Sequence, residues 1–222
     1  RDAVGTMRMQ NIDRLFSSLP RLLRDISIDL GKEIELRIDG SEVEVDREMV
    51  EALRDPLTHI LRNAADHGIE TADERRALGK DPVGHIRIVA RQSGNQILIE
   101  IIDDGRGINV EKLGARAIAA KIVTAGEWQK MSERAQLNTI FTPGLSTADQ
   151  VTSISGRGVG MDVVRTNLQA IGGTIELENY EGHGLKMTLR LPLTLSIIAG
   201  LSVRAGDQIF GISRSSVVEI IS

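Results

Sequence analysis

The sequence contains no cysteine, which excludes disulfide bonds and thiolate metal sites. Among its 222 residues are only three Phe, one Tyr and one Trp, so a hydrophobic core must be built from Leu, Ile, Val and Ala. Basic residues are not in excess, and the formal net charge is −4. Because proteins that neutralise phosphate backbones normally carry a basic surplus, we expect no nucleic acid partner.

Long apolar runs are also missing. No stretch approaches the ~18–20 apolar residues that a membrane span needs, and the first ten residues, RDAVGTMRMQ, hold no apolar signal-peptide segment. The chain starts without Met and stops inside the apolar run SSVVEIIS. We therefore expect a fragment of a larger cytoplasmic protein, with no membrane insertion. Its length fits one good-sized domain with extra material, or two small domains.

Hydrophobic periodicity predicts helices and hairpins in the first half of the chain. Helical spacing covers residues 6–31 and ends at Gly31. EIELRID (33–39) and EVEVD (42–46) alternate apolar and polar residues around Gly40-Ser41, which predicts a hairpin. Asp46 is expected to cap a helix from about 47 to 67 that contains Pro56.

The second half predicts more strands than helices. HIRIVAR (85–91) and QILIEIID (96–103) form a second expected hairpin, and residues 174–193 form a third. Helices are expected within 109–137 and at 161–173, and a long loop at 140–160. This order predicts an α+β fold with helices on one face of a mostly antiparallel sheet.

A polar stripe lies on the helix expected at 47–67. His59, Asn63, Asp66 and His67 recur at helical spacing, and the opposite face is apolar. An Asn carbonyl oxygen suits Mg²⁺, which is held by few protein groups together with substrate phosphates, and imidazoles can donate to phosphate oxygens. The alternative is an ordinary solvated helix face.

Two glycine-rich stretches add to this stripe. In IIDDGRGI (101–108), Asp103 ends an apolar strand and can accept from a base such as the adenine amino group, while Gly105 and Gly107 allow a ligand close to the backbone. An ordinary strand-end turn is the alternative. SGRGVGMDVV (155–164) places glycines before a helix N-terminus, which favours anion binding. It fits neither the dinucleotide fingerprint nor the Walker pattern.

Taken in order, NAADHG, DDGRGI, FTPGLST, GRGVGMDVV and GHG resemble the ATP-binding catalytic domain of the GHKL superfamily, and more narrowly that of the chemotaxis histidine kinases. The resemblance covers nearly the whole chain. It implies a Bergerat-type two-layer α/β sandwich with a mixed, mostly antiparallel sheet. ATP and Mg²⁺ would bind between the helix that carries Asn63 and a lid around Phe141.

The resemblance also implies roles for single residues. Asp103 would accept from the adenine amino group, Asn63 would hold Mg²⁺, and His59 and His67 would contact phosphates, so that His59, Asn63 and His67 form the catalytic set. The implied nucleotide-binding set is Asn63, Asp66, His67, Asp103, Gly105, Gly107, Ser146, Thr147, Gly156, Arg157, Gly158, Val159, Gly160, Met161 and Thr188.

Three regions follow from the same resemblance: a connector helix after a dimerisation domain (1–31), the ATP-binding kinase domain (32–193), and the truncated start of a CheW-like, SH3-like β regulatory domain (194–222). The implied partners are a histidine-phosphotransfer domain, a CheW-like adaptor with chemoreceptors, and response regulators. The parent is expected to be a homodimer and this fragment a monomer.

The chemistry expected is that of a protein-histidine kinase. GHKL ATPases place a Glu one turn before the Asn to activate water, whereas this chain has His59 there. Hydrolysis should then be slow, and positioning with charge neutralisation suffices for phosphoryl transfer. Neither His85 nor His183 resembles a phosphoacceptor, so the acceptor is expected on another domain. A GHKL ATPase and a nucleotide-binding scaffold without turnover remain the alternatives.

Overall fold

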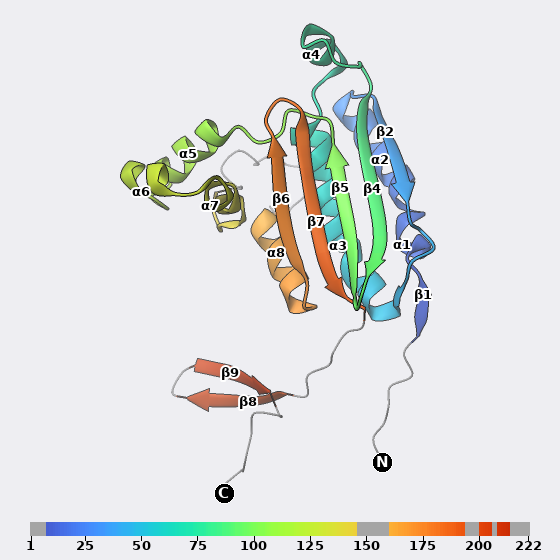
Figure 1. Ribbon diagram of the computed structural model, residues 1–222, viewed down its shortest axis with the longest axis vertical. Helices are drawn as coiled ribbons and strands as arrows, with labels where there is room; N and C mark the ends of the chain where they lie inside the picture. The colour runs from blue at the N-terminus through green and yellow to red at the C-terminus, as the bar shows by residue number, and fades with distance from the viewer. Residues whose placement is uncertain (1–7, 146–159, 194–199, 206–207, 214–222) are drawn as a thin grey trace, which may run out of the picture.

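The computed structural model describes residues 8–145, 160–193, 200–205 and 208–213, the last two ranges by backbone alone. Its centre is a five-stranded sheet in the order β2-β4-β5-β7-β6 (Figure 1). Only β2 and β4 pair in parallel, and the other neighbours are antiparallel. The strands are β2 Ile34–Asp39, β4 Gly84–Ser93, β5 Gln96–Asp103, β6 Thr174–Tyr180 and β7 Gly184–Pro192.

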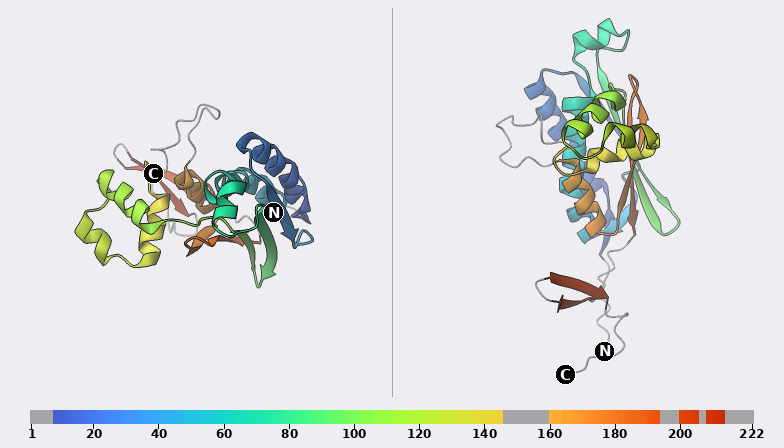
Figure 2. Two further views of the ribbon diagram at one scale, coloured as in Figure 1. Left: turned by 90° about the horizontal axis from the view of Figure 1, so that it is seen from above. Right: turned by 90° about the vertical axis from the view of Figure 1, so that its left-hand side faces the viewer.

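Helices cover one face of this sheet, as Figure 2 shows in its right-hand view. They are α1 Asp13–Phe16, α2 Leu19–Leu30, α3 Arg47–Asn63 and α8 Met161–Ala170. The core between the layers is almost entirely aliphatic, as the scarcity of aromatic residues predicts, with Phe16 and Phe141 as its buried aromatic members. The predicted α+β sandwich, with helices on one face of a mixed, mostly antiparallel sheet, is confirmed.

A smaller helical group lies beside the β6 edge of the sheet (Figure 1). It contains α5 Val110–Ala119, α6 Ala125–Lys130, α7 Glu133–Asn138 and the 3₁₀ turn Thr139–Phe141. Leu113, Ala117 and Leu145 form its own apolar cluster, against which Trp128 packs. A Cβ on Gly114 would lie 2.5 Å from the Trp128 ring, so the indole and α5 fit together only with glycine at this position.

The expected hairpin at 33–46 is wrong. β2 pairs in parallel with β4, whereas β3 (Glu44–Asp46) pairs antiparallel with β1 (Met9–Asn11). Alternation shows that a segment has one apolar face but not which strand lies beside it. Here the turn packs onto β4: Gly40 has a φ of +88°, and a Cβ there would lie 1.9 Å from the Ala90 carbonyl oxygen.

The expected continuous helix at 6–31 is also wrong in its first part. Residues 9–11 form β1, and the helix is divided into α1 and α2. Pro20 sits in the first turn of α2, where its missing N–H costs nothing. The Schellman-type end at Gly31, with φ +62°, is as expected.

Several other predictions are confirmed. Asp46 accepts from the Glu48 amide at 2.8 Å at the start of α3, β4–β5 and β6–β7 are antiparallel hairpins, and α8 ends shortly before Gly172, whose φ is +78°.

β8 Gly200–Ala205 and β9 Gln208–Ser213 form a separate antiparallel pair. Within the part of the chain described, no helix is long and apolar enough to cross a membrane. The division into 1–31, 32–193 and 194–222 stays a prediction.

Candidate functional site

A cavity of about 320 Å³ opens between the C-terminal end of α3, the ends of β5 and β7, α5 and the start of α8. Its volume lies in the range of small-ligand pockets, and its walls are mainly apolar with a few polar groups, as is usual for such sites. The lining residues are Asn63, Ala64, His67, Gly68, Asp103, Gly107, Ile108, Asn109, Lys112, Leu113, Arg116, Ile140, Leu145, Gly160, Met161, Leu185 and Met187.

One wall is a π-helical turn. The helix expected to run to 67 is α-helical only to Asn63 and continues as the π-helix η1 (Ala64–Gly68), in which the Ile69 amide donates to the Ala64 carbonyl at 2.8 Å. Lys32 fixes this turn from outside, because its Nζ donates to the carbonyls of Ala65 at 2.8 Å and Asp66 at 2.6 Å. Such π-turns are often found at functional sites.

The π-turn divides the predicted polar stripe. Asn63 and His67 line the cavity, whereas His59 and Asp66 do not. His59 is half-buried in α3, and burial lowers the pKa of its imidazole. Asp66 is exposed, with Oδ2 3.7 Å from His67 Nε2. The structure thus places Asn63 and His67 at the cavity, whereas Asp66, on the π-turn, lies outside the cavity wall.

Asp103 forms the polar end of the cavity. It follows Ile97, Ile99 and Ile101 on the inward face of β5 and is 8% exposed. Its Oδ1 accepts from the Gly105 amide at 2.9 Å. Burial raises the pKa of this carboxyl to about 6, although backbone amides of Gly105 and Leu185 act in the opposite direction. A nearly buried carboxylate that faces a cavity is suited to accept from a ligand N–H.

The two glycines after Asp103 have different surroundings. Gly107 lines the cavity with a φ of +66°, and a Cβ there would lie 2.8 Å from Asn179 Oδ1. Gly105 does not line the cavity. A Cβ on Gly105 would lie 2.1 Å from the Gly68 carbonyl oxygen, so glycine lets the loop pack on η1.

The start of α8 closes another side. Gly160 and Met161 line the cavity, and Asn63 Nδ2 lies 3.1 Å from Met161 Sδ. The remaining residues predicted in this region, Ser146, Thr147, Gly156, Arg157, Gly158 and Val159, lie outside the described residues.

The prediction for Thr188 is not supported by the geometry. Thr188 is buried but is absent from the cavity wall, whereas Leu185 and Met187 belong to it. Successive side chains of a strand point to opposite faces, so Thr188 shares the other face of β7 with Lys186. The role that the resemblance implies for Thr188 stays a prediction, and Leu185 and Met187 are the β7 side chains that line the cavity.

Sequence reasoning missed the contribution of α5. Asn109 caps this helix by accepting from the Lys112 amide at 2.8 Å. Lys112 and Arg116 then lie one turn apart and both line the cavity, and Arg116 Nη2 donates to the Leu145 carbonyl at 3.2 Å. Two cations four residues apart after an Asn cap were the available signal. They make one side of the cavity suitable for an anionic ligand.

The donor groups at the cavity fit a magnesium ion that has few protein ligands. Within the described residues, no three His, Asp or Glu side chains gather as a metal site. Asn63 nevertheless offers an amide oxygen at the cavity wall. This fits an ion held by one protein group, water and the phosphates of a ligand, which is the usual coordination of Mg²⁺.

This fold and cavity define a GHKL-type nucleotide-binding domain. Residues 52–195 match the family described as "Histidine kinase-, DNA gyrase B-, and HSP90-like ATPase", and the chain belongs to that family. The sequence resemblance to that superfamily is therefore confirmed.

Within the family, the chain is similar to chemotaxis kinases. It is 45% identical over 219 residues to "Sensor histidine kinase CheAY" of Helicobacter pylori, covering 99% of this chain and 27% of that protein. It is 43% identical over 218 residues to "Chemotaxis protein CheA" of Klebsiella aerogenes, covering 98% and 33%. The chain thus spans about a third or less of these relatives.

Among solved structures, the histidine kinase ThkA in complex with the response regulator TrrA is similar in fold. The TM-score is 0.52 at 16% identity, covering 86% of this chain and 43% of that one.

Proposed function

We propose that this chain is the ATP-binding catalytic core of a chemotaxis sensor histidine kinase. It binds ATP with Mg²⁺ and transfers the γ-phosphoryl group to a histidine on a separate phosphotransfer domain, for relay to a response regulator. The observation that carries the proposal is the buried carboxylate of Asp103 in a cavity that Asn63, His67, Lys112 and Arg116 also line.

The polarity of the cavity orients the nucleotide. Asp103 accepts from the exocyclic amino group of adenine, and the apolar walls enclose the base. The phosphates extend toward His67, Lys112 and Arg116, where hydrogen-bond donors and positive charge favour anionic oxygens. Mg²⁺, when bound at Asn63, supplies neutralisation of the phosphate charge.

Transfer breaks the bond between the γ-phosphorus and the β–γ bridging oxygen and forms a phosphorus–nitrogen bond to the acceptor imidazole, with ADP as leaving group. Positioning and charge neutralisation account for most of such catalysis. His59 occupies the place of the water-activating Glu of related ATPases and lies outside the cavity wall. It offers no carboxylate base, which favours transfer over hydrolysis.

The wider setting belongs to the same proposal. The parent protein acts in the cytoplasm as a homodimer, and its C-terminal CheW-like region docks an adaptor and chemoreceptors. The similarity to CheA proteins over nearly the full chain supports this setting. The similarity in fold to ThkA, a histidine kinase solved in complex with a response regulator, supports that class of partner.

Calorimetry and phosphotransfer together test the proposal. ATP is titrated into the chain with and without Mg²⁺, and the chain is then mixed with labelled ATP and an isolated histidine-phosphotransfer domain. Label on the acceptor domain with negligible free phosphate is the expected result. Rapid release of phosphate would instead indicate an ATPase, and binding without transfer to any acceptor would indicate a scaffold.

A further inference from the structure

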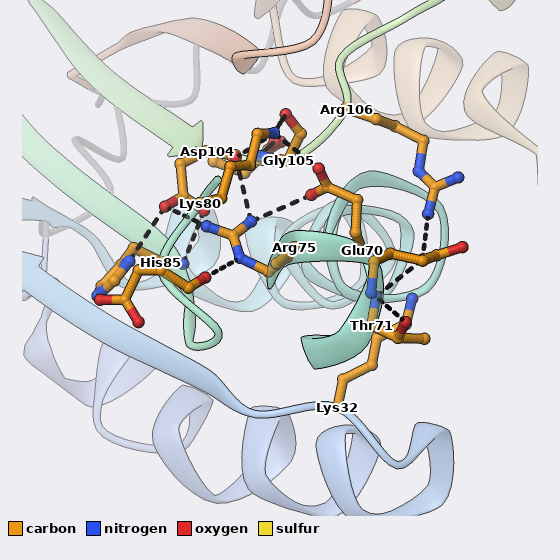
Figure 3. Close-up of polar contacts among 12 residues, drawn as sticks. Lys32, Glu70, Thr71, Arg75, Lys80, His85, Asp104, Gly105 and Arg106 are labelled. Atoms are coloured by element: carbon orange, nitrogen blue, oxygen red, sulfur yellow. Dashed lines mark hydrogen bonds and ion pairs between the residues drawn. The ribbon is translucent and has the colours of Figure 1, made fainter. Parts of the chain in front are cut away.

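An ionic network with a buried centre holds Asp104 and Gly105, the two residues that follow Asp103 in the chain (Figure 3). Its centre is Arg75 in α4 (Ala72–Ala77), which is 1% exposed. The guanidinium donates from Nη2 to Asp104 Oδ2 at 2.9 Å, and from Nη1 to Glu70 Oε1 at 3.1 Å and to the Asp104 carbonyl at 3.2 Å. Its Nε donates to the Asp81 carbonyl.

Lys80 binds the same segment from a second direction. Its Nζ donates to Glu70 Oε2 at 2.7 Å, to the Gly105 carbonyl at 2.9 Å and to the Asp104 carbonyl at 3.2 Å. On β4, the His85 amide donates to Asp104 Oδ1 at 2.9 Å, and His85 Nδ1 lies 3.0 Å from Asp104 Oδ2. The two residues that follow Asp103 are therefore held through a carboxylate and two backbone carbonyls.

This network is a costly way to obtain stability alone. Burying ions requires desolvation, and apolar side chains of similar volume often stabilise a core equally well. Arg75 and Glu70, at 1% and 3% exposed, are almost completely withdrawn from water. What apolar residues could not supply is the fixed path of the Asp104 and Gly105 carbonyls and the local compensation of charge.

Charge compensation bears directly on Asp103. The carboxylates of Asp104 and Glu70 both disfavour ionisation of Asp103, in addition to its burial. Arg75 bridges these two acids, and Lys80 pairs with Glu70. The two cations therefore offset the negative charges that act on the carboxylate of Asp103.

We propose that Arg75, assisted by Lys80, is a positioning residue of the nucleotide site, which fixes the Asp103–Gly105 segment against η1 and α4 and keeps the carboxylate of Asp103 ionised for the adenine amino group. This inference rests on the proposed function, because the ionised carboxylate of Asp103 matters only if it accepts a hydrogen bond from adenine. Arg75 itself contacts no ligand.

The test is a ¹³C NMR titration of the Asp103 carboxyl in the nucleotide-free protein. Arg75→Gln removes a positive charge and should raise the titration midpoint by roughly one pH unit. Asp104→Asn removes a negative charge and should lower it. The titratable and charged groups near Asp103 are Glu70, Arg75, Lys80, His85 and Asp104 in the ionic network, and His67, Lys112 and Arg116 in the cavity wall. Among them, the carboxylates of Asp104 and Glu70 disfavour ionisation of Asp103.

Charge compensation shifts the Asp103 midpoint in opposite directions in Arg75→Gln and Asp104→Asn. A general loosening of the structure would shift the midpoint in the same direction in both variants. The matched control is Arg76→Gln, because Arg76 is the exposed neighbour on α4 and pairs only at the surface with Asp73 in the described structure. It should leave the midpoint unchanged. If Arg75→Gln does not fold, Lys80→Met takes its place, with the same expected upward shift.

ADP affinity at pH 7, measured in parallel, should fall about twofold in Arg75→Gln, because a midpoint raised by one pH unit from about 6 roughly halves the ionised fraction of Asp103. It should stay unchanged in Arg76→Gln. Unchanged midpoints in both Arg75→Gln and Asp104→Asn would overturn the inference, as would shifts of the same sign. If the wild-type protein binds no adenine nucleotide but the two variants shift the Asp103 midpoint in opposite directions, the proposed function is wrong and the charge compensation is confirmed.

Discussion

Gly105 and Gly68 touch through their backbones: the Gly68 carbonyl oxygen accepts from the Arg106 amide at 2.9 Å, and a Cβ on Gly105 would lie 2.1 Å from that oxygen. The contact joins two segments far apart in the sequence, the π-turn that carries His67 and the loop that follows Asp103. It holds the π-turn against this loop, and both segments contribute residues to the cavity wall, His67 and Gly107.

Gly105→Ala should therefore destabilise the protein. The added methyl group meets backbone atoms that cannot rotate away, and we expect a loss of roughly 2–4 kcal/mol in the free energy of unfolding, measured by urea denaturation. Gly126→Ala is the control, because nothing lies within 4 Å of a Cβ there and Gly126 is in α6. It should be neutral or stabilising by up to about 1 kcal/mol. Equal stability of the two variants would contradict the contact.

Asn63→Asp should abolish phosphoryl transfer and leave folding nearly intact. Asn63 is half-buried at the cavity wall, so the isosteric change leaves no void. It loses only the weak Nδ2 contact to Met161 Sδ at 3.1 Å, and it adds negative charge beside the phosphates of the proposed nucleotide. The measurements are transfer of label to the phosphotransfer domain and the thermal midpoint. His59→Gln is the comparison, because His59 does not line the cavity, and it should retain more transfer than Asn63→Asp. A folded Asn63→Asp protein with full transfer would exclude the magnesium role of Asn63.

Lys112→Gln should weaken binding of ATP but not of adenosine. Lys112 lines the cavity from α5, and in the proposed binding mode it contacts the phosphates and not the base. Because its side chain is exposed, we expect a loss of roughly 3- to 10-fold that shrinks as salt is added. Lys130→Gln in α6, outside the cavity, is the matched control. Equal losses for ATP and adenosine would contradict this placement.

The sequence predicted single helices and hairpins better than it predicted which distant strands pair. Helix α8, the β4–β5 and β6–β7 hairpins and the cap at Asp46 follow from short-range spacing and turn residues, and all are present. The partner of β2 is β4, fifty residues further along the chain, and alternation within 33–46 carries no information about it. The two nearest strands were therefore paired with each other, wrongly.

The candidate site shows the same limit. Asn63, His67 and Asp103 were found because motifs mark them, and all three line the cavity. The prediction assumed an ideal α-helix, in which Asp66 lies beside them. In the structure, residues 64–68 form a π-turn that Lys32 fixes from outside, and Asp66 does not line the cavity. Lys112 was missed because a cation on a charged helix is indistinguishable from a solvated one until the fold brings α5 to the cavity.

Asp103 should make both stability and nucleotide binding depend on pH. Burial raises its pKa to about 6 in the folded protein, against an ordinary value of 3.8 for an Asp carboxyl, so protonation is more favourable in the folded state than in the unfolded state. The stabilising contribution is fully present below pH 3.8 and is lost as pH rises through 6. Asp103→Asn should therefore be more stable than wild type at pH 7, by up to about 3 kcal/mol, and the difference should vanish near pH 4.

Binding should show the opposite dependence on pH. The adenine amino group donates to the ionised carboxylate, so ADP affinity should fall below pH 6 by up to about tenfold per pH unit, with release of a proton on binding. Titration of the phosphates also contributes, but equally in Asp103→Asn, and the difference between the two proteins isolates the carboxyl group. Asp103→Asn should also lose the preference for adenine over guanine nucleotides. A variant that keeps both the adenine preference and the wild-type pH profile would show that Asp103 is not the group that recognises the base.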